Sequence, residues 1–192
     1  RQQMFSQRAT ERLRTAREVL AKQRQDQISK RIETLSSDAH EMLDQQSHIL
    51  KGIEGTGQRL KDKKVDQESI RQIRNLLREK QKLQRKLSRV EGELHQVANQ
   101  AAYQEPQVSR KLKQAGNRVR EDFLSEKMQE GSRLLSRGWI DLAREREKGV
   151  NEGLEILAKG LEEAIKFLGK KESPGLDDHL KRAQAAIADL VE

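Results

Sequence analysis

Apolar residues recur at alternating spacings of three and four along most of this chain, and this repeat constrains its fold more than any other feature. Spacings that average 3.5 residues are typical of the buried seam between helices of a left-handed coiled coil. The clearest runs lie within residues 28–53 and 73–101. The repeat predicts an all-α fold of long amphipathic helices packed on one another. The candidate seam residues are Ile28, Leu35, Met42, Leu76, Lys80, Leu83, Leu87 and Leu94.

The composition favours the same fold class. Only 33% of the residues are hydrophobic and 3% are aromatic, whereas 36% are charged, so the chain cannot fill a thick globular core. Low hydrophobicity is also typical of disordered chains, but the regular repeat and the presence of only two prolines favour helices. The absence of cysteine excludes disulfides, thiolate nucleophiles and cysteine-based metal sites.

Turn-forming residues divide the pattern into segments. The first predicted helix covers residues 2–53, and Gly52, Gly55 and Gly57 with the charged residues 61–64 predict a loop after it. The second helix covers residues 67–102, with Asp66 as its N-cap. Within its seam, Lys80 occupies the heptad position called a, where a lysine costs stability and helps to fix the register.

The second half of the chain predicts three more helices. One covers residues 106–137 and begins with Pro106, which suits a first helical position. Gly138 predicts a left-handed turn before a helix over 140–169, although one continuous helix from Pro106 to Leu168 is the alternative. After the break at residues 173–175, a short helix is predicted over 176–191.

Short connections between helices predict antiparallel neighbours. We therefore expect an elongated antiparallel bundle of about four long helices over residues 1–172, with the short C-terminal helix packed on the same domain. In the first helix, Phe5, Ala9, Leu13, Ala16 and Leu20 repeat one residue out of phase with the seam that begins at Ile28, which predicts a change of winding near Arg24. Part of this helix is expected to project or to pair with another chain.

The net charge of +8 is unevenly distributed, and its basic excess peaks at residues 71–89. Besides Lys80, the basic residues there are Arg71, Arg74, Arg78, Lys82, Arg85, Lys86 and Arg89, against the single acid Glu79. The preferred interpretation is that these charges flank a seam and meet acidic residues of the helix over 140–169. The alternative is a basic helix that lies along the phosphates of nucleic acid or on an anionic membrane surface.

No pattern of catalytic or metal-binding residues is present. His40, Asp44 and His48 share one helix face, but the register places them outside the seam. No histidine follows a glutamate by three residues, as a di-iron bundle requires. The glycines at 52–57 lack the Gly-Lys-Ser/Thr ending of a phosphate-binding loop. The sequence thus predicts a non-enzymatic protein with no cofactor, metal or small-molecule substrate.

Three stretches carry a resemblance. The first is Leu134-Leu135-Ser136-Arg137-Gly138 with the repeat that follows it, and the others are Glu79–Gln84 and Val108–Val119. Together they resemble the long Gln-rich helical regions of large, uncharacterised membrane-anchored bacterial proteins. The resemblance implies a soluble region tethered by segments outside this chain, and it implies no activity.

The functional expectation is therefore a helical scaffold or protein–protein interaction module, working through the seam residues. Its protein partner is not identified by the sequence, and a homodimer is among the arrangements expected. The alternative function is the binding of nucleic acid or anionic lipid through residues 71–89.

Overall fold

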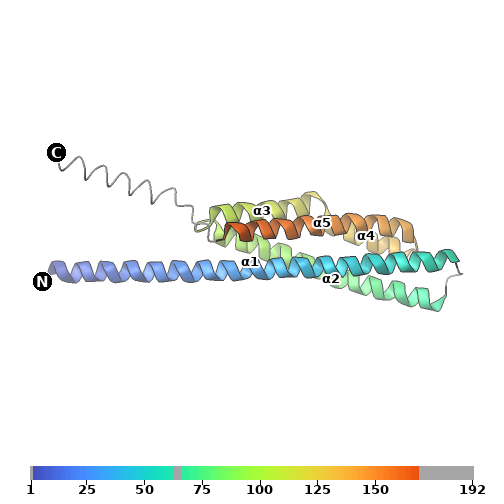
Figure 1. The fold of residues 1–192 in the computed structure, drawn as a ribbon, viewed down its shortest axis with the longest axis horizontal. Coiled ribbons are helices and arrows are strands. Elements are labelled where there is room, and N and C mark those ends of the chain that lie inside the picture. The colour runs from blue at the N-terminus through green and yellow to red at the C-terminus, as the bar shows by residue number, and fades with distance from the viewer. Residues whose placement is uncertain (1, 63–65, 169–192) are drawn as a thin grey trace.

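The computed structural model describes residues 2–62 and 66–168, and in these ranges the chain is all-α with no strand. The helices are α1 (Gln2–Asp62), α2 (Gln67–Ala101), α3 (Pro106–Glu121), α4 (Leu124–Ser136) and α5 (Ile140–Phe167). Figure 1 shows an elongated bundle in which α2 and α5 run alongside the long α1. The predicted helix over residues 176–191 lies outside the described residues.

Contacts between distant residues define the antiparallel packing. On one side of α1, Arg31 Nη1 donates to Gln100 Oε1 of α2 at 2.7 Å, and Arg89 Nη2 of α2 lies 3.1 Å from Asp38 Oδ2. On its other side, Gln46 Nε2 donates to Glu147 Oε2 of α5 at 2.8 Å. The consecutive helices α3 and α4 complete the bundle against α2 and α5. The expectation of an antiparallel all-α bundle is confirmed.

The first helix is longer than predicted. It continues through Gly52, Gly55 and Gly57 to Asp62, so the expected glycine-rich loop is wrong. Glycine in a helix interior costs about 1 kcal/mol relative to alanine, but close packing explains one of these positions. A Cβ atom at Gly52 would lie 2.6 Å from Leu76 Cδ2, so the absence of a side chain at Gly52 makes room for the Leu76 side chain of α2. The glycine therefore serves helix packing.

Local chemistry explains the helix ends that were predicted correctly. Asp66 caps α2, because its Oδ1 accepts a hydrogen bond from Ser69 N at 2.8 Å. Gly138 adopts a φ of 75°, and Trp139 N donates to Leu134 O at 3.0 Å across this turn. This is the left-handed C-terminal turn that glycine favours. The alternative of a continuous helix from Pro106 to Leu168 is therefore wrong.

The predicted helix over 106–137 is two helices, because the chain breaks at Phe123. This residue has φ 49° and ψ 44°, a left-handed conformation that non-glycine residues seldom adopt. The break lets Leu124 turn fully into the core, while the Phe123 ring remains 62% exposed. Burial of the leucine offsets the strain of the turn.

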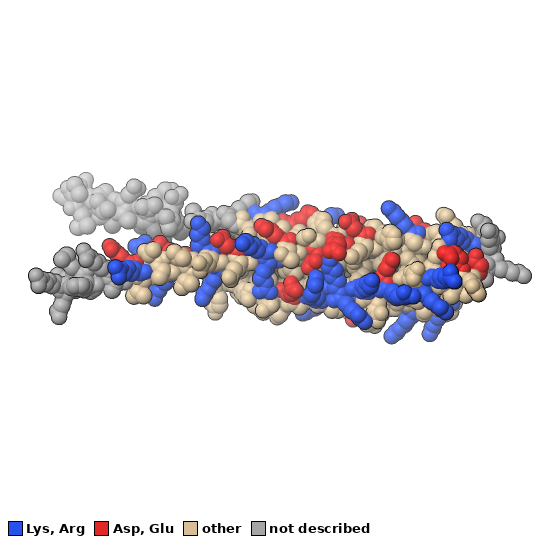
Figure 2. All heavy atoms as spheres, turned by 90° about the horizontal axis from the view of Figure 1, so that it is seen from below, with Lys and Arg blue, Asp and Glu red and all other residues tan. Residues whose placement is uncertain are grey.

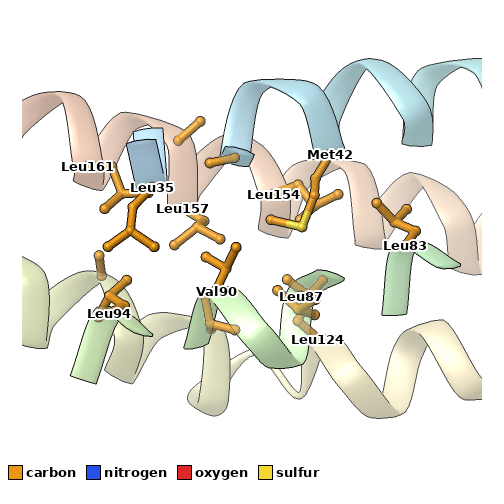
Figure 3. Close-up of a cluster of buried hydrophobic side chains, with 14 of the residues drawn as sticks. Leu35, Met42, Leu83, Leu87, Val90, Leu94, Leu124, Leu154, Leu157 and Leu161 are labelled. Atoms are coloured by element: carbon orange, nitrogen blue, oxygen red, sulfur yellow. The ribbon is translucent and has the colours of Figure 1, made fainter. Parts of the chain in front are cut away.

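Buried apolar residues of all five helices form the core between the helices. Figure 3 shows Leu35 and Met42 of α1 meeting Leu154, Leu157 and Leu161 of α5, with leucines of α2 on the other side. Leu124 of α4 packs near Leu87 of α2. Small side chains such as Ala39, Ala143 and Ala164 are also fully buried, which keeps the helices close.

Candidate functional site

The eight seam residues predicted from the sequence are all buried, with exposed fractions of 6% or less. They contact other helices of the same chain rather than a free surface. The register prediction is correct for these positions, yet the seam itself offers nothing to a second protein. Any surface that binds a partner must therefore lie outside it.

A polar layer interrupts the apolar core where α1, α2, α4 and α5 meet. Lys80 of α2 and Glu147 of α5 form an ion pair with exposed side-chain fractions of 1% and 0%. Gln46 of α1 donates from Nε2 to Glu147 Oε2 at 2.8 Å and to Glu147 O at 3.1 Å. A Cβ atom at Gly131 of α4 would overlap the Glu147 carboxylate, so glycine makes the space for this pair.

The electrostatics of the polar layer serve structure rather than chemistry. Burial lowers the pKa of Lys80 below its usual range, and the neighbouring Glu147 carboxylate only partly offsets this effect. Gln46 Oε1 has no hydrogen-bond partner, so the layer is not fully satisfied. A charge pair with less than 2% exposure cannot meet a substrate. The sequence predicted the inward position of Lys80 but not the burial of Glu147.

The basic residues of α2 form an exposed stripe. With 100° between successive residues, six of these side chains point within an arc of about 80° around the helix axis. They span residues 71–89, a length of about 27 Å along the axis. We call the following residues the basic stripe: Arg71, Arg74, Arg78, Lys82, Arg85 and Arg89. All six are exposed. In Figure 2, Lys and Arg side chains spread over the half of the molecule that holds the first part of α2.

The acidic partners of these charges differ from those expected. Within the described residues, only Arg89 of the stripe forms ion pairs, with Asp38 and Glu93. Lys86 lies beside the stripe and pairs with Asp38 and Glu41 of α1. Although burial lowers the pKa of Lys86, these two carboxylates raise it overall. The expectation that the helix over 140–169 supplies the acids holds only for Lys80.

Residues 11–24 of α1 form a second exposed surface, which we call the arm. Every residue of the arm is exposed, whereas Ile28 marks the end of the bundle with an exposed fraction of 4%. Leu13, Val19 and Leu20 are 63%, 51% and 53% exposed. Figure 1 shows this part of α1 extending past the ends of the other labelled helices. Within the described residues the arm projects, which is one of the two predicted alternatives, and its pairing with another chain stays a prediction.

The apolar face of the arm lies in line with α2. At 100° per residue, Leu13, Ala16 and Leu20 point to the side of α1 that carries Asp38 and Gly52, and both of these residues contact α2. However, α2 ends at Ala101, level with Arg31 of α1, so it does not reach the arm. The helix continues through Arg24, and the predicted change of phase coincides with the end of the bundle. Among residues 2–62 and 66–168, no helix packs on the apolar repeat of the arm.

The remaining candidate sites are ordinary structural features. His40 and His48 lie on the surface and approach Glu162 and Glu79 at 3.0 and 3.5 Å. Within residues 2–62 and 66–168, no cluster of three histidine, cysteine, aspartate or glutamate side chains could hold a metal ion. Trp139 is half exposed and lies 5.4 Å from the Arg137 guanidinium, at the turn between α4 and α5.

Comparisons with known proteins identify no relative. No family model, curated protein or solved structure matches the chain. In the described part of the chain, no helix has both the length and the hydrophobicity to cross a membrane. The functional proposal therefore depends on the basic stripe, the arm and the closed seam.

Proposed function

We propose that this protein is a non-enzymatic helical scaffold whose arm is a docking surface for an amphipathic helix. The observation that carries the proposal is the exposure of Leu13, Val19 and Leu20 on a helix that the bundle holds in place. The arm has the heptad spacing of a seam, which is the pattern that a partner helix recognises. The bundle supports it by anchoring α1 from Ile28 onward.

The closed core supports a scaffold rather than an enzyme. The seam is buried within one chain, and the one charged layer that the described residues place in it, Lys80 with Glu147, is sealed from solvent. A rigid bundle fixes the direction of the arm, so a helix that binds there pays little for ordering it. The resemblance to membrane-anchored bacterial proteins would place such a scaffold beside a membrane, tethered by segments outside this chain.

A position-specific photo-crosslink tests the docking surface. A photoreactive amino acid is placed at Leu13 or Leu20 in the full-length chain, and at Glu18 as the control on the opposite side of α1. We expect adducts at the two apolar positions, whether with this chain or another protein, and few at Glu18. Equal yields at all three positions would contradict a docking face.

The basic stripe supports a second candidate function, the binding of a polyanion. Five of its residues form no ion pair within the described part of the chain, so their charges are available to phosphates. The stripe follows a single helix, and residues 71–89 contain no aromatic side chain on which a base could stack. This favours contact with a phosphate backbone without sequence specificity.

A charge-matched comparison tests this second function. The stripe variant carries Arg71→Gln, Arg78→Gln and Arg85→Gln, and the control carries the exposed α3 changes Arg110→Gln, Lys113→Gln and Arg118→Gln. If the stripe binds duplex DNA, its variant should lower the slope of log affinity against log salt by about three, because three phosphate contacts are lost. An equal fall in the control, or no binding by the wild type, would refute it.

A further inference from the structure

We infer that the apolar face of the arm is the docking site for residues 176–191 of the same chain. The inference rests on the proposed role of the arm as a docking surface, and it names the occupant. Leu176, Leu180, Ala183, Ile187 and Leu190 are spaced four, three, four and three apart. The same heptad rule spaces Ala9, Leu13, Ala16 and Leu20. Two such faces form a seam when they pack together.

The path of α5 brings this segment to the arm. In the antiparallel pair of α1 and α5, His40 Nε2 lies 3.0 Å from Glu162 Oε1, and Ser47 Oγ lies 3.4 Å from Asn151 Oδ1. Residue numbers along α5 therefore rise as those along α1 fall. Leu168 is the last described residue of this path, and Figure 1 shows that α5 ends where the arm leaves the bundle. α5 thus runs toward the arm and ends beside it.

The lengths of the segment and the arm agree. A helix over the 16 residues 176–191 would be about 24 Å long, and the 14 residues of the arm extend over about 21 Å. The eight steps from Leu168 to Leu176 can reach about 26 Å. Neighbouring helix axes lie about 8–10 Å apart, so this connection can cross the end of the bundle to the side of α1 that faces α2.

Charge favours this occupant over a second copy of the arm. The arm holds five basic and two acidic residues, a net charge of +3. Residues 176–191 hold two basic and three acidic residues, a net charge of −1. Two arms packed together would bring charges of the same sign into proximity, whereas the C-terminal segment brings the opposite sign. The acidic residues of the segment are Asp177, Asp178 and Asp189, and the basic residues of the arm are Arg12, Arg14, Arg17, Lys22 and Arg24.

Engineered disulfides test the assignment directly, because residues 1–192 contain no cysteine. In this chain, Ala16→Cys is combined with Ala183→Cys or with Ile187→Cys. One control moves the first cysteine to Thr15, which is turned by about 100° on α1. The other control moves the second cysteine to Ala185, away from the apolar face of the segment. Oxidation is carried out in dilute solution, and mass spectrometry separates disulfides within one chain from disulfides between chains.

Docking in the same chain predicts that at least one face-to-face pair forms an intrachain disulfide several-fold faster than both controls. Equal rates in all the pairs would overturn the inference. Disulfide-linked dimers of the Ala16→Cys single variant would also overturn it, because a second copy would then occupy the arm. Such dimers would contradict the proposed occupant but not the role of the arm as a docking surface. The photo-crosslink at Leu20 tests that role separately.

Discussion

Lys80 and Glu147 form an ion pair at the point where four helices meet, and neither side chain has more than 1% of its surface exposed. Removing one partner leaves a buried charge unpaired, so Lys80→Ala or Glu147→Ala should cost about 3–5 kcal/mol of unfolding free energy. The double change Lys80→Met with Glu147→Leu should recover most of this loss, because it leaves no charge behind. Urea unfolding of the wild type and the three variants measures these free energies. A double variant that loses as much unfolding free energy as the two single variants together would contradict the pairing.

Gly131 and Gly92 are both helical glycines, but they should respond oppositely to alanine. A Cβ atom at Gly131 meets the Glu147 carboxylate, so Gly131→Ala should destabilise the fold by about 1–3 kcal/mol. Gly92 has nothing within 4 Å of its Cβ position, so Gly92→Ala should stabilise α2 by about 0.5–1 kcal/mol. Thermal unfolding compares the two variants. A stabilising Gly131→Ala would mean that the polar layer is looser than the structure describes.

Two turns with positive φ also allow a reciprocal test. Gly138→Ala should lower stability by about 1 kcal/mol, because alanine is strained at a φ of 75°. Phe123→Gly should raise it by up to about 1 kcal/mol, because it removes the strain at a φ of 49° from an exposed side chain. Denaturant midpoints measure both effects. A large loss of stability in Phe123→Gly would show that the exposed ring makes contacts that matter.

His40 should make stability depend weakly on pH. Its Nδ1 lies 2.9 Å from Ser36 O and its Nε2 lies 3.0 Å from Glu162 Oε1, and two acceptors favour the doubly protonated ring. The pKa of His40 is raised, first by the Ser36 carbonyl and then by Glu162. The stabilisation is therefore complete below the unfolded pKa of about 6.5 and is lost as pH rises through the folded value.

The measurement is the difference in melting temperature between the wild type and His40→Gln at about pH 5.5 and about pH 8.5. His95→Gln serves as the control, because His95 forms no ion pair within the described residues. His40 and Glu162 are each about half exposed, so the effect should amount to a few tenths of a kcal/mol. A difference that grows with rising pH would contradict the assigned contacts.

The periodicity predicted the seam because burial imposes a repeat that can be read without knowing the fold. Leu35, Met42, Leu83 and Leu94 all lie where the heptad places them. The same reasoning failed at Gly52 and Phe123, because packing between helices overrides the local preference of the residue at both positions. Glycine predicts a loop, but at Gly52 it permits close packing with Leu76. The repeat predicts a helix through Phe123, but the chain turns there and Leu124 is fully buried.

Pairings between helices were harder to predict than positions on a helix. Lys80 could be placed inside, but its partner Glu147 stood among several acidic residues of one helix, and nothing in the sequence ranked them. Asp38 and Glu41 of α1 were not anticipated as partners for Lys86. Which helices are neighbours determines such contacts, and the repeat does not encode that choice. For the same reason, the sequence could not show whether the seam closes within one chain.

The closure of the seam within one chain can be tested by the solution mass of an arm variant. Leu13→Gln with Leu20→Gln removes the apolar face of the arm and leaves the seam intact. We predict a monomer by light scattering at all concentrations, with a melting temperature that does not depend on concentration. A dimer whose melting temperature rises with concentration would contradict this closure, because the seam would then pair between chains.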